Sequence, residues 1–392
     1  MKGTIRQRRP GGKFTAYWWE TDPKTGKLKQ HSQSGFTGIR AAQGFLNTQL
    51  AEVAAGKSHT VDRKITLRQL FEDHWLPVAR SGAKRGSSAE RRRPTTVSGY
   101  ETIANAWILP HIGGVALLSL TPKHVDEWLT ALQAHGGRGG RPLGARSAQA
   151  SLRVLKTAIE YAVDQGMVAR NAAMKASTPG GRAREMTSWT VEEAREFLEL
   201  AKADRLRAAW LLCLLRGLRR GEVAGLRWDA VDLEARKVRI VTTRVVVGGT
   251  KVIESLPKTA KGYRTIPLDD TLVAALKQHR AKQLEERLAW GEGWTDSGFV
   301  FVRENGEPFA PPSISQRFER LCITGGIRRI RLHDLRHTCA TLAQASGMPV
   351  ERLSKMLGHA DVKITLSIYT HSTEDDTAES AATFTDSLLG NL

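Results

Sequence analysis

The sequence predicts a multidomain protein: a small three-stranded sheet with one helix, then an all-helical domain, then a mixed α+β domain that is mainly helical. Three observations predict this order. Residues 4–31 alternate between apolar and polar side chains, residues 65–176 follow a helical period, and three β-rich stretches interrupt a helical remainder. With 392 residues, of which 41% are hydrophobic, the chain is long enough for several cores.

The first module contains strand-like segments separated by turns at residues 10–12 and 22–26 that are rich in glycine and proline. We expect strands at residues 4–8, 14–20 and 27–31. A helix is expected over residues 39–54, because its apolar positions fall on one face and would cover the sheet. Together with the linker that follows, this module occupies residues 1–64.

Helical periodicity begins at residue 65, where Leu67, Leu70, Phe71 and Trp75 have the i, i+3, i+4 spacing of a buried helix face. Further helices are expected over residues 97–107, 122–135 and 145–166. Loops rich in glycine and arginine separate them at residues 81–94 and 136–144. The sequence therefore predicts an all-α domain over residues 65–180.

The third domain is placed over residues 181–392, after a Pro-Gly-Gly break. Thr190 followed by Glu193 is a capping box that starts a helix. Helices are expected near residues 190–202, 206–216 and 219–226, followed by β-rich stretches over 237–247, 251–256 and 263–268. Helices are expected again from residue 272 to the end, so the domain is mixed and mainly α.

The net charge of +19 points to a polyanionic partner, and without an amphipathic anchor a nucleic acid is favoured over a membrane. Residues 1–64 carry a net +8, residues 65–180 a net +7 and the remainder a net +4. The first two domains are therefore expected to make most phosphate contacts. Candidate ligands in the first module, with solvated surface as the alternative, are Arg6, Arg8, Arg9 and Lys13.

Other composition signals narrow the class of protein. No run of about 18 apolar residues and no apolar signal segment occurs, so we expect a cytoplasmic protein without a membrane partner. Cys213, Cys322 and Cys339 lie in apolar helical patterns without CxxC spacing, which favours buried side chains over disulfides or a metal site. No GxxxxGK[ST] loop occurs, so no nucleotide cofactor is expected.

Two polar motifs in the third domain have ordinary interpretations when taken alone. Arg219, with Glu222 three residues later, is typical of an ion pair on a helix surface. His333 and Arg336 fit a solvated helix face. His333 and His337 also have the i, i+4 spacing of a zinc site, but the glutamate of HExxH is absent and Arg336 would crowd the cation.

The order of the motifs is more specific than any one of them. After GLRxxE and HxxR comes LGH, where a helix ends at a glycine cap before His359. Tyr369, one of five tyrosines, lies ten residues later and 33 residues after Arg336. In this order, over residues 214–371 or about 40% of the chain, the sequence resembles the tyrosine recombinase (phage integrase) family.

The resemblance implies a catalytic set: Arg219, Lys258, His333, Arg336, His359 and Tyr369. Lys258 matches the lysine of the family's β-hairpin, because it stands between Leu256-Pro257 and the segment Arg264-Thr265-Ile266-Pro267-Leu268. Lys261 is the alternative for this position. No metal ion and no other cofactor is expected.

Phosphodiester chemistry gives each residue of this set a role. Non-bridging oxygens must be neutralised, which the forked donors of Arg219 and Arg336 suit. Tyr369 would attack with His333 as base, because a phenol with a pKa near 10 needs activation.

The other matched residues complete the reaction. Lys258 would protonate the 5′ oxygen, His359 would donate to the phosphate, and Glu222 would orient Arg219 or His333. A 3′-phosphotyrosyl link stores the bond energy, so rejoining needs neither ATP nor metal.

The resemblance also implies an arm-binding, lambda-type organisation. Residues 1–64 would be an arm-type DNA-binding module, residues 65–180 a helical, SAM-like core-binding domain, and residues 181–392 the catalytic domain with a tail. The implied partners are double-stranded DNA with core and arm attachment sites, further copies of the chain in a homotetramer, an excisionase and a host DNA-bending protein. The tail, residues 372–392, is expected to dock on a neighbouring protomer, with packing on its own domain as the alternative.

The leading functional hypothesis is a recombinase that integrates or excises a phage or other mobile element in the bacterial cytoplasm. The resemblance favours attack by Tyr369 in cis, on the phosphate bound by its own protomer, with attack on a neighbour's phosphate as the alternative. Four alternatives stay open: a chromosome-dimer resolvase, type IB topoisomerase-like strand relaxation, a DNA-binding regulator on a recombinase scaffold, and a zinc-dependent nuclease. The added first module argues against the resolvase, and the full catalytic set argues against the regulator.

Overall fold

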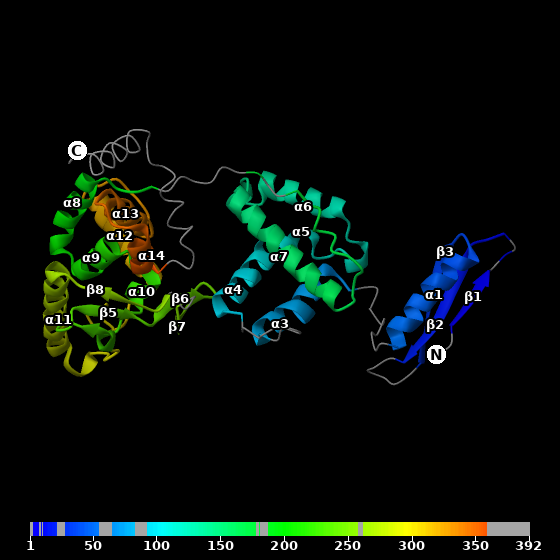
Figure 1. Cartoon of the computed structure of the whole chain (residues 1–392), viewed down its shortest axis with the longest axis horizontal. Coiled ribbons are helices and arrows are strands. Elements are labelled where there is room, and N and C mark those ends of the chain that lie inside the picture. The colour runs from blue at the N-terminus through cyan, green and yellow to red at the C-terminus, as the bar shows by residue number, and fades with distance from the viewer. Residues whose placement is uncertain are drawn as a thin grey trace, which may run out of the picture. The chain divides into compact units, whose positions relative to one another are not determined.

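The computed structural model describes residues 3–7, 9, 11–21, 28–54, 65–82, 92–177, 180, 187–257 and 262–358. The chain divides into two compact units, residues 1–182 and 183–392. Figure 1 shows the elements of both, coloured from the N-terminus to the C-terminus. Within the described ranges, no helix is long and apolar enough to cross a membrane.

The first unit begins with a three-stranded antiparallel sheet that has a helix on one face (Figure 1). Its elements are β1 (Gly3–Gln7), β2 (Phe14–Thr21), β3 (Leu28–Phe36) and α1 (Ile39–Ala54). Ala16 and Trp18 alternate along β2 toward α1 and pack against Leu46. Tyr17 and Trp19 lie on the other face and are half-buried. The predicted sheet and helix are confirmed, although β3 continues past its predicted end at residue 31.

The rest of the first unit is helical in its described residues. Its helices are α2 (Leu67–Gln69), α3 (Leu76–Ser81), α4 (Pro94–Ile103), α5 (Leu109–Ile112), α6 (Pro122–His135) and α7 (Ala145–Asp164), with π-helical stretches at Leu70–Trp75 and Ala104–Ile108. Leu152, Leu155 and Ile159 on α7 lie about one turn apart and enter the core. The helices predicted over 122–135 and 145–166 are confirmed. The helix predicted to begin at residue 97 begins earlier, at Pro94, because proline is well suited to a first helical position.

The second unit is mainly helical and contains two small sheets. Its helices are α8 (Val191–Leu200), α9 (Arg207–Arg216), α10 (Arg220–Ala224), α11 (Asp270–Trp290), α12 (Pro311–Thr324), α13 (Asp334–Ala345) and α14 (Val350–Leu357). Helix α9 is buried nearly throughout, and α13 packs along it. An aromatic cluster of Trp189, Phe197, Trp210 and Phe318 joins α8, α9 and α12. The three cysteines are free and buried, as predicted.

The β-rich stretch predicted over residues 237–247 is two strands in different sheets. One sheet has the order β4 (Val231–Asp232), β5 (Lys237–Ile240), β8 (Arg264–Pro267), and the other is a hairpin of β6 (Thr243–Val247) and β7 (Lys251–Ser255). Val238 and Ile240 are buried, whereas the next apolar residue, Val241, is exposed. Two adjacent apolar residues cannot face the same side of one strand, so the alternation ends there and the chain leaves the sheet.

The prediction of helices from residue 272 to the end is wrong for residues 294–310, which are not helical. Here Phe299, Val300, Phe301 and Val302 form a fully buried run with no helical period. The backbone of this run makes no helical hydrogen bonds of its own: the Val300 N–H donates to the Leu226 carbonyl at 2.9 Å, and the Val300 carbonyl oxygen lies 2.8 Å from Nε2 of His279 on α11. A short, continuous apolar run of this kind is compatible with extended chain, and this signal in the sequence argues against a helix here.

Candidate active site

A left-handed turn at Gly217 leads into Arg219, which lines a cavity. The buried helix α9 ends at Gly217, whose φ is +62°, and Arg219 then occupies the position just before α10. A Cβ atom on residue 217 would lie 2.3 Å from Cδ2 of Leu357. Glycine is therefore required both by the backbone conformation and by the close approach of α14.

Glu222 is a buried carboxylate held between two arginines. Its Oε1 accepts from Nη1 of Arg219 at 2.8 Å and from Nη1 of Arg264 at 2.9 Å. Its Oε2 accepts from the backbone N–H of Arg219 at 2.9 Å and from Nη2 of Arg264 at 2.8 Å. Burial alone would raise the pKa of Glu222, but the hydrogen bonds and charge of Arg264, with the charge of Arg219, outweigh it and lower the pKa to about 2.

Arg336 comes from α13 and is buried beside the Gly217 turn. Its Nη1 donates to the Gly217 carbonyl at 2.7 Å and its Nη2 to the Leu357 carbonyl at 2.5 Å. Burial and the neighbouring charge of Arg219 lower the pKa of Arg336 to about 9, so the group is still protonated at neutral pH. Two backbone carbonyls thus compensate a charge that has little contact with water.

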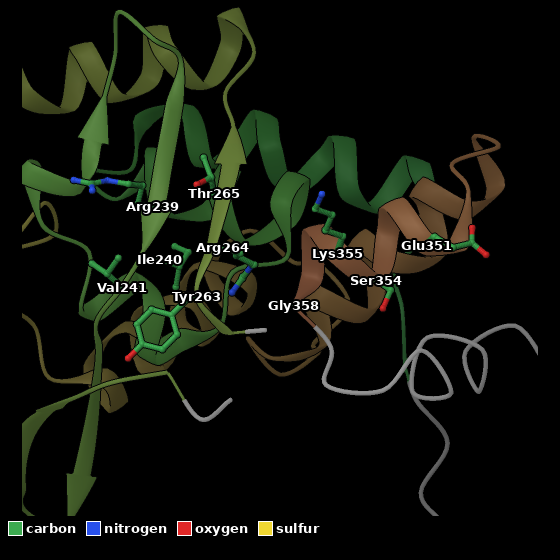
Figure 2. A pocket seen from close by; sticks show the side chains of 10 residues that line it. All are labelled: Arg239, Ile240, Val241, Tyr263, Arg264, Thr265, Glu351, Ser354, Lys355 and Gly358. Carbon is green, nitrogen blue, oxygen red and sulfur yellow. The ribbon is translucent and has the colours of Figure 1, made fainter. Parts of the chain in front are cut away.

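The end of α14 is the point where three arginines meet. The carbonyl of Met356 accepts from Nε of Arg264 at 2.8 Å, and the carbonyl of Gly358 accepts from Nη2 of Arg219 at 3.2 Å. With the Arg336 bond to Leu357, three consecutive carbonyls are each taken by a different arginine. The C-terminal end of a helix carries partial negative charge and unpaired carbonyls, so it attracts guanidinium groups. Figure 2 shows Arg264 on β8 beside Gly358 at this helix end.

His333 lies at the start of α13, on a cavity of about 780 Å³ that Arg219 also lines. Desolvation, together with the positive charges of His337, Arg336 and Arg219, lowers the pKa of His333 to about 4. Its ring therefore stays neutral at physiological pH. The same cavity is lined by Arg220 and by the arginines that precede α13, at residues 329 and 331.

The structure brings together four of the residues singled out in the sequence: Arg219, Glu222, His333 and Arg336. Of the two partners expected for Glu222, its side chain hydrogen-bonds to Arg219. The other catalytic candidates lie outside the described residues: Lys258, its alternative Lys261, His359 and Tyr369. The tail over residues 372–392, with its expected docking, lies outside them too.

Sequence reasoning missed the role of Arg264. It stands 42 positions after Glu222, so no local spacing connects the two. A signal is nevertheless present at β8, where Arg264 and Ile266 lie on one side of the strand, and where Ile266 and Leu268, the residue just after the strand, are buried. An arginine on the apolar side of a strand needs a buried partner, which indicates an ion pair in the core.

Two further sets of candidate residues are the basic side chains of the first module and the histidine pair considered for zinc. Arg6 is exposed on β1, with its guanidinium 5.8 Å from the ring centre of Tyr17, while Arg9 and Lys13 are exposed near the β1–β2 turn. Arg8 lies outside the described residues. His333 and His337 meet edge to face with ring centres 5.4 Å apart, and the described part of the chain has no group of three or more His, Cys, Asp or Glu suited to a metal ion.

The chain is similar to known recombinases and integrases in sequence and in fold. The Phage integrase family matches residues 186–376, and the Phage integrase, N-terminal SAM-like domain matches residues 87–133. A tyrosine recombinase XerC-like protein of Caldanaerobacter subterraneus subsp. tengcongensis is 32% identical over 298 residues, which cover 71% of this chain and 75% of that protein.

Two solved structures have a similar fold. One is the Tn1549 transposon integrase in complex with transposon right end DNA, with a TM-score of 0.64, 21% identity, and coverage of 80% of this chain and 98% of that one. The other is a lambda integrase tetramer bound to a Holliday junction, with a TM-score of 0.53, 18% identity, and coverage of 93% and 94%.

Proposed function

The chain belongs to the phage integrase family, the tyrosine recombinases, which are DNA strand-transferring enzymes, and we propose that Tyr369 is the nucleophile with which it cuts and rejoins DNA. The reaction passes through a 3′-phosphotyrosyl intermediate and integrates or excises a phage or other mobile element. The observation that carries this proposal is the convergence of Arg219 and Arg336 on one helix end, directly before His359 in the sequence.

The two arginines suit the charge that develops during in-line attack on a phosphodiester. That charge lies on the non-bridging oxygens, and donors already held in place stabilise it without reorganisation. The described contacts of Arg219 and Arg336 occupy two of the five N–H groups of each side chain. The remaining groups are the proposed phosphate donors.

His333 is proposed as the base that accepts the proton of Tyr369. Its lowered pKa keeps the imidazole unprotonated at neutral pH, as a base requires. The charges of Arg336 and Arg219, which contribute to the lowered pKa of His333, would act in the same direction on a phenol brought beside them and would favour the phenolate. Lys258, with Lys261 as the alternative, is proposed to protonate the 5′ oxygen, and His359 to donate to the phosphate. We propose that Tyr369 attacks in cis, on the phosphate bound by its own protomer.

The other domains are proposed to hold the DNA. Residues 1–64 would bind arm sites, residues 65–180 would act as core-binding domain and residues 181–392 as catalytic domain. A similar fold forms a tetramer on a Holliday junction in lambda integrase, which supports a homotetramer on DNA here. An excisionase and a host DNA-bending protein are the further proposed partners, in the bacterial cytoplasm.

The open face of the first sheet is the proposed arm-site surface. Arg6 and Tyr17 meet there, and the helix covers only the opposite face. A basic side chain over an aromatic ring, on the sheet face opposite the helix, suits contact with a DNA groove and its phosphates. Replacing Arg6 with alanine should weaken binding of arm-site DNA and lower the slope of log K against log salt by about 1. An unchanged slope would place this phosphate contact elsewhere.

A suicide duplex with a nick in the crossover site tests the chemistry. The wild-type protein should form a covalent adduct with the DNA in the presence of EDTA, and Tyr369→Phe should form none. Arg219→Ala and Arg336→Ala should still bind the duplex but not cleave it. An adduct formed by Tyr369→Phe would refute the nucleophile assignment, and loss of cleavage in EDTA would favour a metal-dependent nuclease.

A further inference from the structure

We propose that Arg264 is a positioning residue for strand cleavage, which fills the acceptor sites of Glu222 and so keeps the guanidinium group of Arg219 available to the phosphate. This inference rests on the proposed role of Arg219 and adds a residue that the six-residue catalytic set does not contain. Arg264 stands at the start of β8, a few residues after Lys258 and Lys261 in the sequence. It is held away from solvent, with 5% of its side chain exposed, against 36% for Arg219.

The hydrogen bonds around Glu222 divide its acceptor capacity evenly. A carboxylate has about four lone-pair sites. Arg264 fills one on each oxygen, and Arg219 fills the other two, one through its backbone N–H and one through Nη1. The guanidinium group of Arg219 therefore makes a single contact with Glu222, and its Nη2 reaches the Gly358 carbonyl instead.

Without Arg264, the hydrogen bonds to Glu222 would no longer be shared between two arginines. Two acceptor sites of a buried carboxylate would open, and Arg219 is the charged group able to fill them with both arms of its fork. A bidentate Arg219–Glu222 pair would turn the guanidinium away from the phosphate. It would also neutralise Arg219 one to one, whereas in the present cluster the carboxylate is shared between two arginines.

Arg264 also connects Glu222 and Arg219 to α14. Its Nε donates to the Met356 carbonyl, so one side chain joins Glu222 to the helix end whose next carbonyls bind Arg336 and Arg219. Figure 2 shows how Arg264 lies between β8 and this end of α14. A change at Arg264 therefore alters the direction of Arg219 and the support of the helix end together, without direct contact with DNA.

The test measures binding and cleavage separately on the suicide duplex. Arg264→Gln should bind the DNA with a dissociation constant within about threefold of wild type, while its single-turnover cleavage rate falls roughly 10²-fold, the scale for one misplaced electrostatic donor. Arg264→Lys should recover part of the rate, because an ammonium group restores the charge but not the three-point geometry. Loss of DNA affinity in parallel with cleavage would instead mean a binding role.

A double variant separates positioning from folding. Glu222→Gln combined with Arg264→Gln removes both charges, so the net charge of the cluster is restored and Arg219 has no buried carboxylate to pair with. Its cleavage rate should exceed that of Arg264→Gln by about tenfold. A double variant that cleaves no faster than Arg264→Gln would overturn the proposal.

Arg205→Gln is the matched control. Arg205 also makes two hydrogen bonds to a shielded carboxylate, that of Glu286. None of its described contacts involves the arginine cluster, that is, Arg219, Arg264 and Arg336. This variant should lower thermal stability while its folded fraction cleaves at the wild-type rate. If wild type forms an adduct and Arg264→Gln cleaves equally fast, the inference about Arg264 fails alone. If wild type forms no adduct, the proposed function fails.

Discussion

Replacing Gly217 with alanine would test how closely α14 packs against the turn that presents Arg219. The new Cβ would lie 2.3 Å from Cδ2 of Leu357 and 3.4 Å from Cγ of Arg336. Leu357 is fully buried, so its side chain has no open space into which to rotate. The methyl group must therefore displace the end of α14, whose Leu357 carbonyl accepts from Arg336.

Two energetic costs add at this position. A left-handed backbone conformation costs a non-glycine residue about 1–2 kcal/mol. An extra methyl group in a filled core costs roughly 1–3 kcal/mol. We therefore expect Gly217→Ala to lower the free energy of unfolding by about 2–5 kcal/mol. Gly347 is the matched control, because its φ is +78° and a Cβ there meets no atom within 4 Å. Gly347→Ala should cost only the backbone contribution.

Urea unfolding of the two variants measures this difference. Single-turnover cleavage gives a second readout, because a shift of about 1 Å at a reacting group can cost roughly 10²-fold in rate. Gly217→Ala should lose both stability and rate, whereas Gly347→Ala should keep its rate. Equal losses of stability in the two variants would refute the claim that Leu357 closes the space beside Gly217.

The buried charges and hydrogen bonds of the second unit lead to three more expected outcomes, each measured by urea unfolding. Because the pKa of Glu222 is lowered to about 2 from 4.5, the protein should lose about 3 kcal/mol as pH falls from 4.5 toward 2. Glu222→Gln should flatten that dependence, and an unchanged acid limb would contradict it. The pKa of His333 is lowered to about 4 from 6.5, so on acidification the unfolded chain takes up a proton before the folded chain does. The free energy of unfolding should therefore decrease as the pH falls from 6.5 to 4. His333→Gln should lose less over this range; an identical loss would assign the effect to another group. Thr338→Val leaves the backbone N–H of Trp189 without the hydroxyl that accepts from it, and should cost about 1–3 kcal/mol. A cost near zero would mean that the N–H finds another acceptor.

Local patterns in the sequence were sufficient wherever the structure depends on neighbours along the chain. The bounds of α1 follow from its apolar spacing, and α8 starts at the capping box of Thr190 and Glu193. The glycine cap at residue 358 was equally readable, because a left-handed φ at a helix end favours glycine. The motif order likewise indicates Arg219, Glu222, His333 and Arg336, which lie close together in the structure.

Contacts between residues that are far apart in the sequence cannot be predicted from such local patterns. Arg264 pairs with a carboxylate on α10 and a carbonyl on α14. The residues next to Arg264 in the sequence identify neither partner. The splitting of residues 237–247 between two sheets has the same origin, since β5 pairs with β8, which follows β6 and β7 in the chain. Strand partners and buried ion pairs are set by tertiary contacts, which period and propensity do not encode.

The arginine cluster explains why so many contacts converge on a helix of eight residues. Three guanidinium groups and one carboxylate leave two positive charges in excess where Arg264 and Arg336 have little contact with water, which opposes folding. The carbonyls of Met356, Leu357 and Gly358 offset part of this repulsion without neutralising it, because they carry only partial charge. A full carboxylate in their place would neutralise more of the charge, but it would also compete with the proposed phosphate for the same donors. The use of carbonyls, with one shared glutamate, therefore keeps the arginines ordered while their charge stays available, which is the condition for electrostatic preorganisation.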